Sequence, residues 1–179
     1  MIKMGSNTGE IPVTGNVWNI SSDFDTRLMA IRLEKEFQEL LKSLNSNGVR
    51  YLLIGGYAVV LNGYVRNTTD LDIAVSDRPE NAEKLVAALR EFGFDVPGLD
   101  ASLFTKPNSL IRLGHEPLKV EILNYLKGVG FENAYRNRKI VDLDGLEISL
   151  IAIEDLIANK RAVGRYLDLA DVEQLERRL

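Results

Sequence analysis

The sequence contains no cysteine and only one histidine, His115, among its 179 residues. Without cysteine the chain has no disulfide, no thiol nucleophile and no cysteine-ligated zinc site. A single histidine excludes a metal site built from several histidines and leaves little room for a Ser-His catalytic triad. These absences exclude several common kinds of active site before any motif is considered.

Long hydrophobic runs and an excess of positive charge are also missing. No apolar run approaches the ~20 residues of a membrane span, and the N-terminus lacks the basic head and apolar stretch of a signal peptide. Lys and Arg number 22 against 26 Asp and Glu, so the net charge is −4. The overall positive charge that is typical of proteins that bind duplex DNA is therefore absent. We expect a soluble cytoplasmic protein that binds neither membranes nor duplex DNA, although a local patch could hold a single strand or a tRNA end.

The residues that are present indicate one folded domain with a loose tail. Hydrophobic residues make up 45% of the chain, which is enough to form a core. Residues 1–23 are rich in Gly, Ser, Thr and Asn without a sustained period, and we expect a flexible N-terminal tail whose end Trp18 and Ile20 could pin to the body. Residues 24–179 are predicted to form a single α/β (α+β) domain, with a mixed β-sheet flanked by helices.

Periodicity and turn signals locate most of the elements. Apolar residues recur at helical spacing between Phe37 and Leu44, and Asp144-Gly145 between two alternating runs is typical of a tight β-hairpin. Residues 94–114 give a poor signal apart from a candidate strand at 109–113. The other expected elements are strands at 51–54, 70–75, 118–123, 139–143 and 146–150, helices at 57–62, from Pro79 to Gly93 and from Ile153 onward, and a last helix that ends the chain.

Two acids in the strand at 70–75 are the most informative residues. Asp70 and Asp72 are separated by one residue, so in a strand their side chains lie on the same face, about 6–7 Å apart. Leu71 and Ile73 then point the other way, into the core. Two carboxylates on a rigid element are a natural ligand set for Mg²⁺, which prefers hard oxygen ligands and shares them with substrate phosphates. The alternative is a pair of solvated acids on an open sheet face.

The preceding turn favours the metal-binding interpretation. Gly55-Gly56 follows a short buried strand and precedes a short helix, and glycine lets a ligand approach the backbone closely. Backbone N–H groups at such a turn suit a phosphate. An ordinary tight turn would explain the two glycines alone, but the order of strand, Gly-Gly, helix, polar loop and D-x-D strand is much less common.

A third acid and two cations extend the candidate site. Glu121 faces away from Val120 in the strand at 118–123, and it completes a three-carboxylate cluster if that strand neighbours Asp70; otherwise it is a surface acid paired with Lys119 or another cation. Lys160 lies at the edge of an apolar helical stripe, where its amine could meet a phosphate or extend into solvent. Arg66, just before the D-x-D strand, could neutralise a phosphate or pair with a nearby acid.

The start of the last helix has a second possible set of acids. Asp168 is predicted to be the N-cap of this helix. Asp171 would then lie at the third helical position, where the helix dipole favours a negative charge.

Together these motifs resemble the nucleotidyltransferase superfamily (DNA polymerase β-like). More narrowly they are similar to the minimal bacterial nucleotidyltransferases and the AbiEii-type toxin group. In those proteins a G-G or G-S turn precedes an R-x-T-x-D-[LI]-D strand, and a K…R…D-l-x-D pattern follows near the C-terminus. The resemblance covers roughly residues 34–179. The matching segments are Gly55-Gly56-Tyr57-Ala58, Gly63, Arg66-Asn67-Thr68-Thr69-Asp70-Leu71-Asp72, residues 160–165 and residues 168–171.

The resemblance implies an activity and a role for each matching residue. The implied reaction moves a nucleoside monophosphate from an NTP to a hydroxyl acceptor and releases pyrophosphate. Gly55, Gly56 and Lys160 would contact the triphosphate of the NTP. Asp70 and Asp72 would bind two Mg²⁺ ions, which can clamp the attacking and leaving oxygens of an in-line displacement. The acceptor could be RNA or a tRNA 3′ end, a protein hydroxyl or a small molecule.

Three departures from the pattern support an alternative. Gly56 stands where many members have Ser. Glu121 stands at the third catalytic and metal-binding position, where Asp is more common. The chain also ends about where larger relatives begin a helical substrate domain. The alternative is a catalytically degenerate protein of this fold that binds a partner protein, for example as one half of a toxin–antitoxin pair.

Overall fold

The computed structural model describes residues 33–115 and 118–179, which fold around one six-stranded sheet with the strand order β3-β4-β2-β1-β6-β5. The predicted tail at 1–23, with Trp18 and Ile20, lies outside the described residues. The mixed α/β class predicted from the sequence is confirmed. The strands are β1 (Tyr51–Leu53), β2 (Leu71–Val75), β3 (Leu110–His115), β4 (Leu118–Leu123), β5 (Lys139–Leu143) and β6 (Leu146–Leu150). The helices are α2 (Lys35–Ser46), α3 (Gly55–Leu61), α4 (Pro79–Phe92), α5 (Ser102–Thr105), α6 (Phe131–Asn137), α7 (Ile153–Val163) and α8 (Tyr166–Glu176).

Parallel and antiparallel pairs alternate in the sheet. β2 is parallel to β4 and antiparallel to β1, and β1 is parallel to β6. The edges are the antiparallel pairs β3–β4 and β5–β6. Asp144 and Gly145 in the β5–β6 turn both have positive φ, 53° and 82°, as a two-residue hairpin of the tightest kind requires. The predicted hairpin is therefore confirmed.

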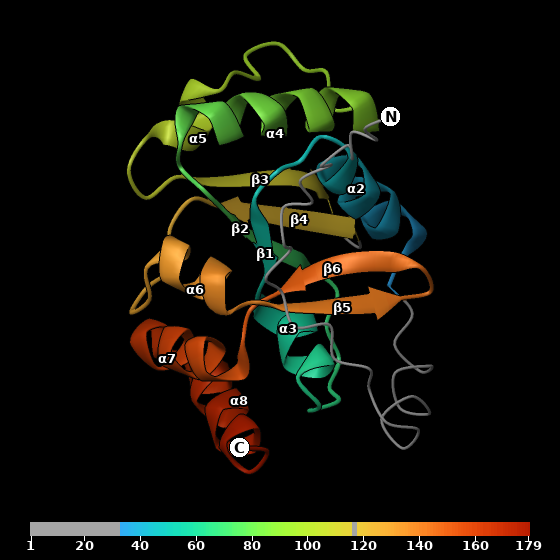
Figure 1. Ribbon diagram of the computed structural model, residues 1–179. Helices are drawn as coiled ribbons and strands as arrows, with labels where there is room; N and C mark the ends of the chain where they lie inside the picture. Colours follow the sequence, from blue (N-terminus) through green and yellow to red (C-terminus); the bar gives the residue numbers. More distant parts are fainter. Residues whose placement is uncertain (1–32, 116–117) are drawn as a thin grey trace, which may run out of the picture.

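The sheet is covered on both sides. Helices α2 and α4 lie on one side of it, and α3, α7 and α8 lie on the other (Figure 1). The apolar stripe predicted for α2 is buried, because Phe37, Leu40, Leu41 and Leu44 are each no more than 1% exposed. Helix α4 begins at Pro79 and ends against Gly93, whose φ of 109° is left-handed, as the sequence predicts. None of the helices in the described residues has the length and apolar character needed to cross a membrane.

Several elements differ from the sequence expectation. Helix α3 begins at Gly55, so the Gly-Gly pair forms its first turn rather than a separate loop. Asp70 lies one residue before β2. Helices α5 and α6, of four and seven residues, were not predicted. The last helix begins at Tyr166 with Arg165 as its N-cap, so the prediction that Asp168 is the N-cap is wrong.

Candidate active site

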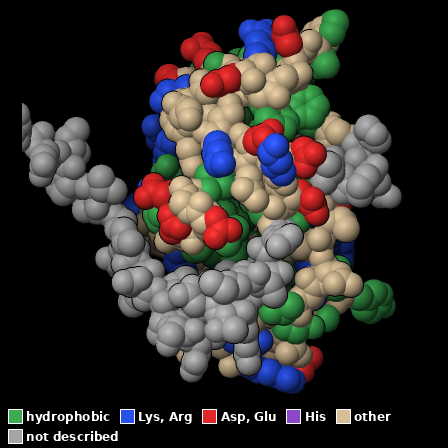
Figure 2. Space-filling view, turned by 90° about the vertical axis from the view of Figure 1, so that its right-hand side faces the viewer, with side chains coloured by type: hydrophobic (Ala, Val, Ile, Leu, Met, Phe, Trp, Pro, Cys, Tyr) green, Lys and Arg blue, Asp and Glu red, His purple; other side chains and the backbone are tan. Residues whose placement is uncertain are grey.

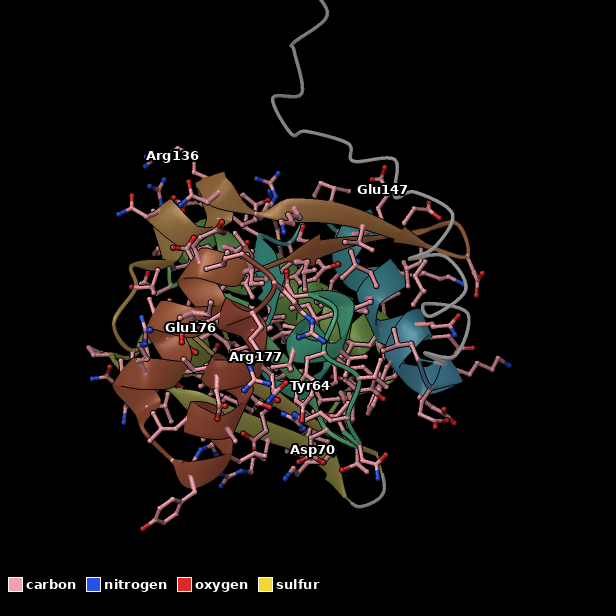
Figure 3. All side chains as sticks on the ribbon, turned by 90° about the horizontal axis from the view of Figure 1, so that it is seen from below. Tyr64, Asp70, Arg136, Glu147, Glu176 and Arg177 are labelled. Atoms are coloured by element: carbon pink, nitrogen blue, oxygen red, sulfur yellow. The ribbon has the colours of Figure 1, made fainter. Side chains whose placement is uncertain are left out.

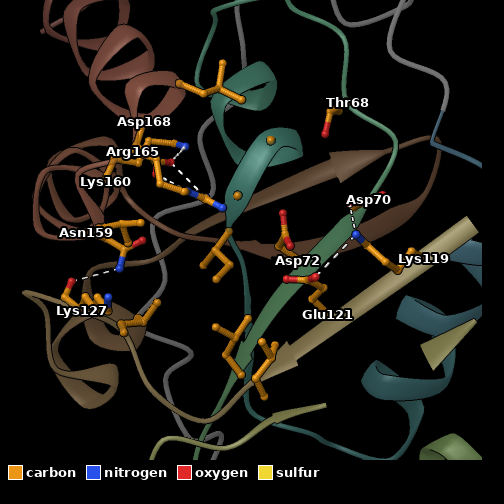
Figure 4. A pocket seen from close by; sticks show the side chains of 18 of the residues that line it. Thr68, Asp70, Asp72, Lys119, Glu121, Lys127, Asn159, Lys160, Arg165 and Asp168 are labelled. Carbon is orange, nitrogen blue, oxygen red and sulfur yellow. Dashed lines mark hydrogen bonds and ion pairs between the residues drawn. The ribbon is translucent and has the colours of Figure 1, made fainter. Parts of the chain in front are cut away.

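A pocket of about 460 Å³ lies between the sheet and helices α7 and α8 (Figure 4). Its floor is the face of β2, β3 and β4 that points away from α2 and α4. In the view from below, the C-terminal helices lie in front of the sheet (Figure 3). The structure brings together in this pocket all seven residues that the sequence singled out: Gly55, Gly56, Arg66, Asp70, Asp72, Glu121 and Lys160.

Strand pairing brings the three acids together. Asp72 on β2 and Glu121 on β4 are partners in the parallel register, so the expected neighbourhood of the two strands is observed. Asp70 precedes Asp72 by two residues and lines the same pocket. Leu71 and Ile73 between and after the two acids are fully buried on the other face. The period of two in this segment therefore separates core side chains from pocket side chains.

The Gly-Gly turn packs directly against the acid strand. Gly55 has a φ of +64°, and a side chain there would overlap the carboxylate of Asp72. A side chain at Gly56 would overlap the hydroxyl of Thr68. Glycine is needed at both positions because β2 and the segment before it approach the first turn of α3 so closely.

The pKa of Asp72 is raised from its ordinary value of 3.8 to about 6. Burial is the largest cause, and the negative charges of Glu121 and then Asp70 add to it. The Gly56 N–H, which donates to the carboxylate, and the charge of Lys160 lower the pKa only in part. Within the described residues no Lys or Arg forms an ion pair with Asp72, so its negative charge lacks a contacting cation.

Two basic side chains contact the other two acids. The Nζ atom of Lys119 lies 2.7 Å from Oδ2 of Asp70 and 3.6 Å from Oε1 of Glu121. Nε of Arg112 lies 2.9 Å from the same Oε1 atom. The hydrogen bond to Asp70 raises the pKa of Lys119, and the one to Glu121 raises the pKa of Arg112. The sequence left two alternatives for Glu121, a place in the acid cluster or an ion pair with Lys119 or another cation. The structure shows both at once. In the part of the chain that the structure describes, no three acids are arranged to hold a metal ion.

The opposite wall of the pocket is a buried ion-pair network. Lys160 is 4% exposed, and its Nζ atom lies 3.0 Å from Asp168 and 2.8 Å from Asp171. Arg66 donates to both carboxylate oxygens of Asp171, at 2.8 and 3.0 Å. Arg165 donates to Asp168 at 2.6 Å. The second alternative for Arg66, pairing with a nearby acid, is the one observed. Lys160 likewise does not extend into solvent.

This network explains why Asp168 does not cap the helix. Burial alone would raise the pKa of Asp168, but the hydrogen bonds from Arg165 and Lys160 outweigh it and hold that pKa below its ordinary value. The carboxylate oxygens of Asp168 already accept charge-assisted hydrogen bonds from two cations, so they do not accept hydrogen bonds from backbone N–H groups at the helix start. Of the three cations, Arg165 keeps most contact with solvent, with a side chain that is 76% exposed.

The pocket floor changes character along β4. Lys119 and Glu121 are followed on the same face by Leu123, which pairs with Leu110 on β3. The pocket therefore has a charged end beside the acids and an apolar end beside Leu110 and Leu123. The sequence analysis missed Arg112 and the apolar end, gave Arg165 no role although it lies in the matched segment 160–165, and considered Lys119 only as a surface partner. Period-two alternation in β4 was the one signal that pointed to Lys119 and Leu123.

Comparison with solved structures supports the fold. The chain is similar to lincosamide antibiotic adenylyltransferase LnuA in its lincomycin-bound form, at 21% identity and a TM-score of 0.55, over 82% of this chain and 98% of that one. It is also similar to a Thermotoga maritima protein assigned as a nucleotidyltransferase, at 19% identity and a TM-score of 0.50, over 83% of this chain and 94% of that one. No curated protein matches the sequence.

A family match covers nearly the whole described chain. Residues 33–178 match the family described as nucleotidyl transferases of unknown function (DUF2204). The match includes the Gly-Gly turn, the three acids and the ion-pair network. The predicted resemblance to nucleotidyltransferases is confirmed, while the narrower resemblance to the AbiEii-type toxin group stays a prediction. This chain belongs to that nucleotidyltransferase family.

Proposed function

We propose that this protein is a Mg²⁺-dependent enzyme that transfers a nucleoside monophosphate from an NTP to a hydroxyl acceptor and releases pyrophosphate. The observation that carries the proposal is the carboxylate of Asp72. It is largely buried, packs against the Gly-Gly turn, has a pKa raised to about 6 and forms no ion pair within the described residues. A carboxylate held in this state is poised to accept a cation.

The acids fit a magnesium ion by their chemistry. Asp72 would hold it, because its carboxylate supplies the hard oxygen ligands that Mg²⁺ prefers and forms no ion pair within the described residues, and the negative charges of Asp70 and Glu121 would add to the attraction. When bound, Mg²⁺ would neutralise the charge that develops on the phosphoryl oxygens during transfer. The proton of the acceptor hydroxyl would pass to a carboxylate of the same cluster, either Asp72 or Glu121.

The charged end of the pocket would hold the triphosphate. Arg165 is the most exposed cation of the facing wall, and so it is the best placed to contact phosphate oxygens. Arg66 and Lys160 would act mainly through their positive field, since both are already paired with acids. Gly55 and Gly56 would let the phosphates approach the backbone. The apolar end near Leu110 and Leu123 would receive the less polar part of a substrate, either the base or the acceptor.

The acceptor hydroxyl would belong to RNA or a tRNA end, to a protein or to a small molecule. On the face shown in Figure 2, the described Lys and Arg side chains lie mixed with Asp and Glu, which does not favour duplex DNA. A cytoplasmic location is part of the proposal, and the lack of cysteine agrees with it.

A second candidate function is a catalytically degenerate, partner-binding component of a toxin–antitoxin pair. One observation favours it: Asp70 and Glu121 are already neutralised by Lys119 and Arg112. It predicts stable co-purification with another chain and no pyrophosphate release. The proposed enzyme predicts turnover of an NTP instead.

Label transfer tests the proposal directly. The protein is incubated with Mg²⁺, each of the four α-³²P-labelled NTPs and total cellular RNA and protein. We expect label on one class of acceptor, lost by at least about 10³-fold in Asp70→Asn and Asp72→Asn, since each removes a charge that acts in the transition state. Asp77→Asn removes an exposed acid just after β2 and should transfer label normally. Undiminished transfer in Asp72→Asn would overturn the assignment of the site.

A further inference from the structure

The ammonium of Lys119 bridges two carboxylates of the site. It lies 2.7 Å from Asp70 and 3.6 Å from Glu121, and the contact with Asp70 joins β4 to the segment before β2 (Figure 4). All three side chains are partly shielded from solvent, with exposed fractions of 26% for Lys119, 31% for Asp70 and 20% for Glu121. Shielded ion pairs are screened less by water and salt than surface pairs, so this bridge is a persistent feature of the pocket.

The bridge occupies the oxygens that a metal ion would need. Oδ2 of Asp70 contacts Lys119, and Oδ1 of Asp70 accepts a hydrogen bond from the Thr69 hydroxyl at 3.1 Å. Oε1 of Glu121 contacts both Lys119 and Arg112. Of the three acids, only Asp72 has no ion pair within the described residues. The cluster thus has three negative charges, two positive charges and one carboxylate open to a cation.

We propose that Lys119 is a resident cation that takes the place of one of the two divalent ions expected of this kind of site, so that the protein holds a single divalent ion with its NTP. The inference rests on the proposed function. A second divalent ion would have to displace the ammonium from both Asp70 and Glu121. One ion at Asp72 avoids this cost.

Counting bound metal tests the inference without measuring activity. The full chain is dialysed to equilibrium against ⁵⁴Mn²⁺ and the α,β-methylene analogue of each NTP, which cannot release pyrophosphate. The ratio of bound Mn²⁺ to bound nucleotide is then determined. We expect one Mn²⁺ per nucleotide in the wild type and two in Lys119→Met, which frees Asp70 and Glu121. Lys119→Arg keeps the charge and should retain one, as should Lys42→Met, which removes an exposed lysine on α2.

Each other outcome has a distinct meaning. Two Mn²⁺ per nucleotide in the wild type would overturn the role of Lys119 and leave the proposed function standing. A ratio of one in folded Lys119→Met would also overturn it, because the amine would then not be what excludes the second ion. Lys119→Gln serves the same purpose if Lys119→Met does not fold. If no analogue is retained by any variant, the proposed function itself fails.

Discussion

Two charge clusters face each other across the pocket, and they differ in burial. In the first, Lys160, Asp168 and Asp171 have side chains that are at most 5% exposed. In the second, Lys119, Asp70 and Glu121 have side chains that are 20–31% exposed. Both clusters pair lysine with two carboxylates, so residue type alone does not distinguish them. The difference in burial predicts that loss of one partner costs the first cluster much more stability than the second.

The physical reason is the cost of leaving a charge without water. Removing one partner from a buried ion pair leaves a charge that neither solvent nor protein compensates, which is strongly destabilising. Removing one partner from a partly exposed pair lets water take its place, and little stability is lost. The network around Lys160 also joins the segment before β2 to helices α7 and α8, through Arg66 and Asp171. It therefore forms part of one wall of the pocket and contributes to its charge.

The largest expected effect is the loss of Asp171, which is fully buried and contacts both Lys160 and Arg66. We expect Asp171→Ala to lower the free energy of unfolding by about 3–5 kcal/mol, since the buried Lys160 and the partly buried Arg66 both lose a partner. Urea denaturation measures it. Glu173→Ala is the matched control on the same helix: it removes an exposed acid that pairs with Arg177 and should change the free energy by less than about 1 kcal/mol. Equal effects of the two substitutions would contradict the structural role of the buried network.

The second largest effect is a gain in stability, expected when Asp72 is replaced by Asn. Because the pKa of Asp72 is raised from 3.8 to about 6, the folded protein binds the proton more tightly than the unfolded chain. Stability contributed by protonated Asp72 is present below pH 3.8 and falls as the pH rises to about 6. Asp72→Asn removes this dependence. At pH 7.5 it should be more stable than the wild type by up to about 3 kcal/mol, while near pH 4 the two should be almost equal.

Chemical denaturation of both proteins at several pH values checks this prediction. The other titrating groups are common to the two proteins, so their contributions largely cancel in the difference. A difference that does not depend on pH would show that the Asp72 carboxylate is not shifted in the free protein. Lower stability of Asp72→Asn at pH 7.5 would show that some contact of the ionised carboxylate stabilises the fold.

The smallest expected effect concerns Lys119. Lys119→Met should change the free energy of unfolding by less than about 1 kcal/mol, because water can solvate Asp70 and Glu121 in its absence. Lys160→Met, the same substitution across the pocket, should cost several kcal/mol. Thermal or urea unfolding of the two variants side by side compares the clusters directly. If Lys119→Met destabilises as much as Lys160→Met, the two clusters do not differ in the way that their burial implies.

The sequence predicted those parts of the site that depend on neighbours in the chain. The alternation of Asp70, Leu71, Asp72 and Ile73 places two acids on one face, since side chains in a strand alternate whatever lies beside it. The Gly-Gly turn and the Asp144-Gly145 hairpin follow from the backbone freedom of these residues. Strand β4 was predicted with its observed bounds, so the face on which Glu121 lies was also known.

Contacts between distant segments could not be predicted in the same way. Lys160 at the edge of an apolar stripe is compatible with an exposed amine or a buried one. Whether the Lys160 amine is exposed or buried depends on whether the fold places Asp168 and Asp171 beside it. The N-cap prediction for Asp168 failed for the same reason: local preference favoured a cap, but a buried ion pair with Lys160 and Arg165 satisfies the carboxylate instead.

The sequence by itself determined the α/β class of the chain, the absence of thiol and polyhistidine chemistry, and a pair of acids that follows a glycine turn. Only the tertiary structure decided what those acids contact. The register of β2 against β4 places Glu121 beside Asp72, and the packing of α7 and α8 buries Lys160 while Lys119 stays within reach of solvent. Local patterns arise from backbone geometry, which each residue carries with it. The charge state and accessibility of a site depend on contacts between, and burial of, groups that are far apart in the chain. Only the folded structure brings these groups together.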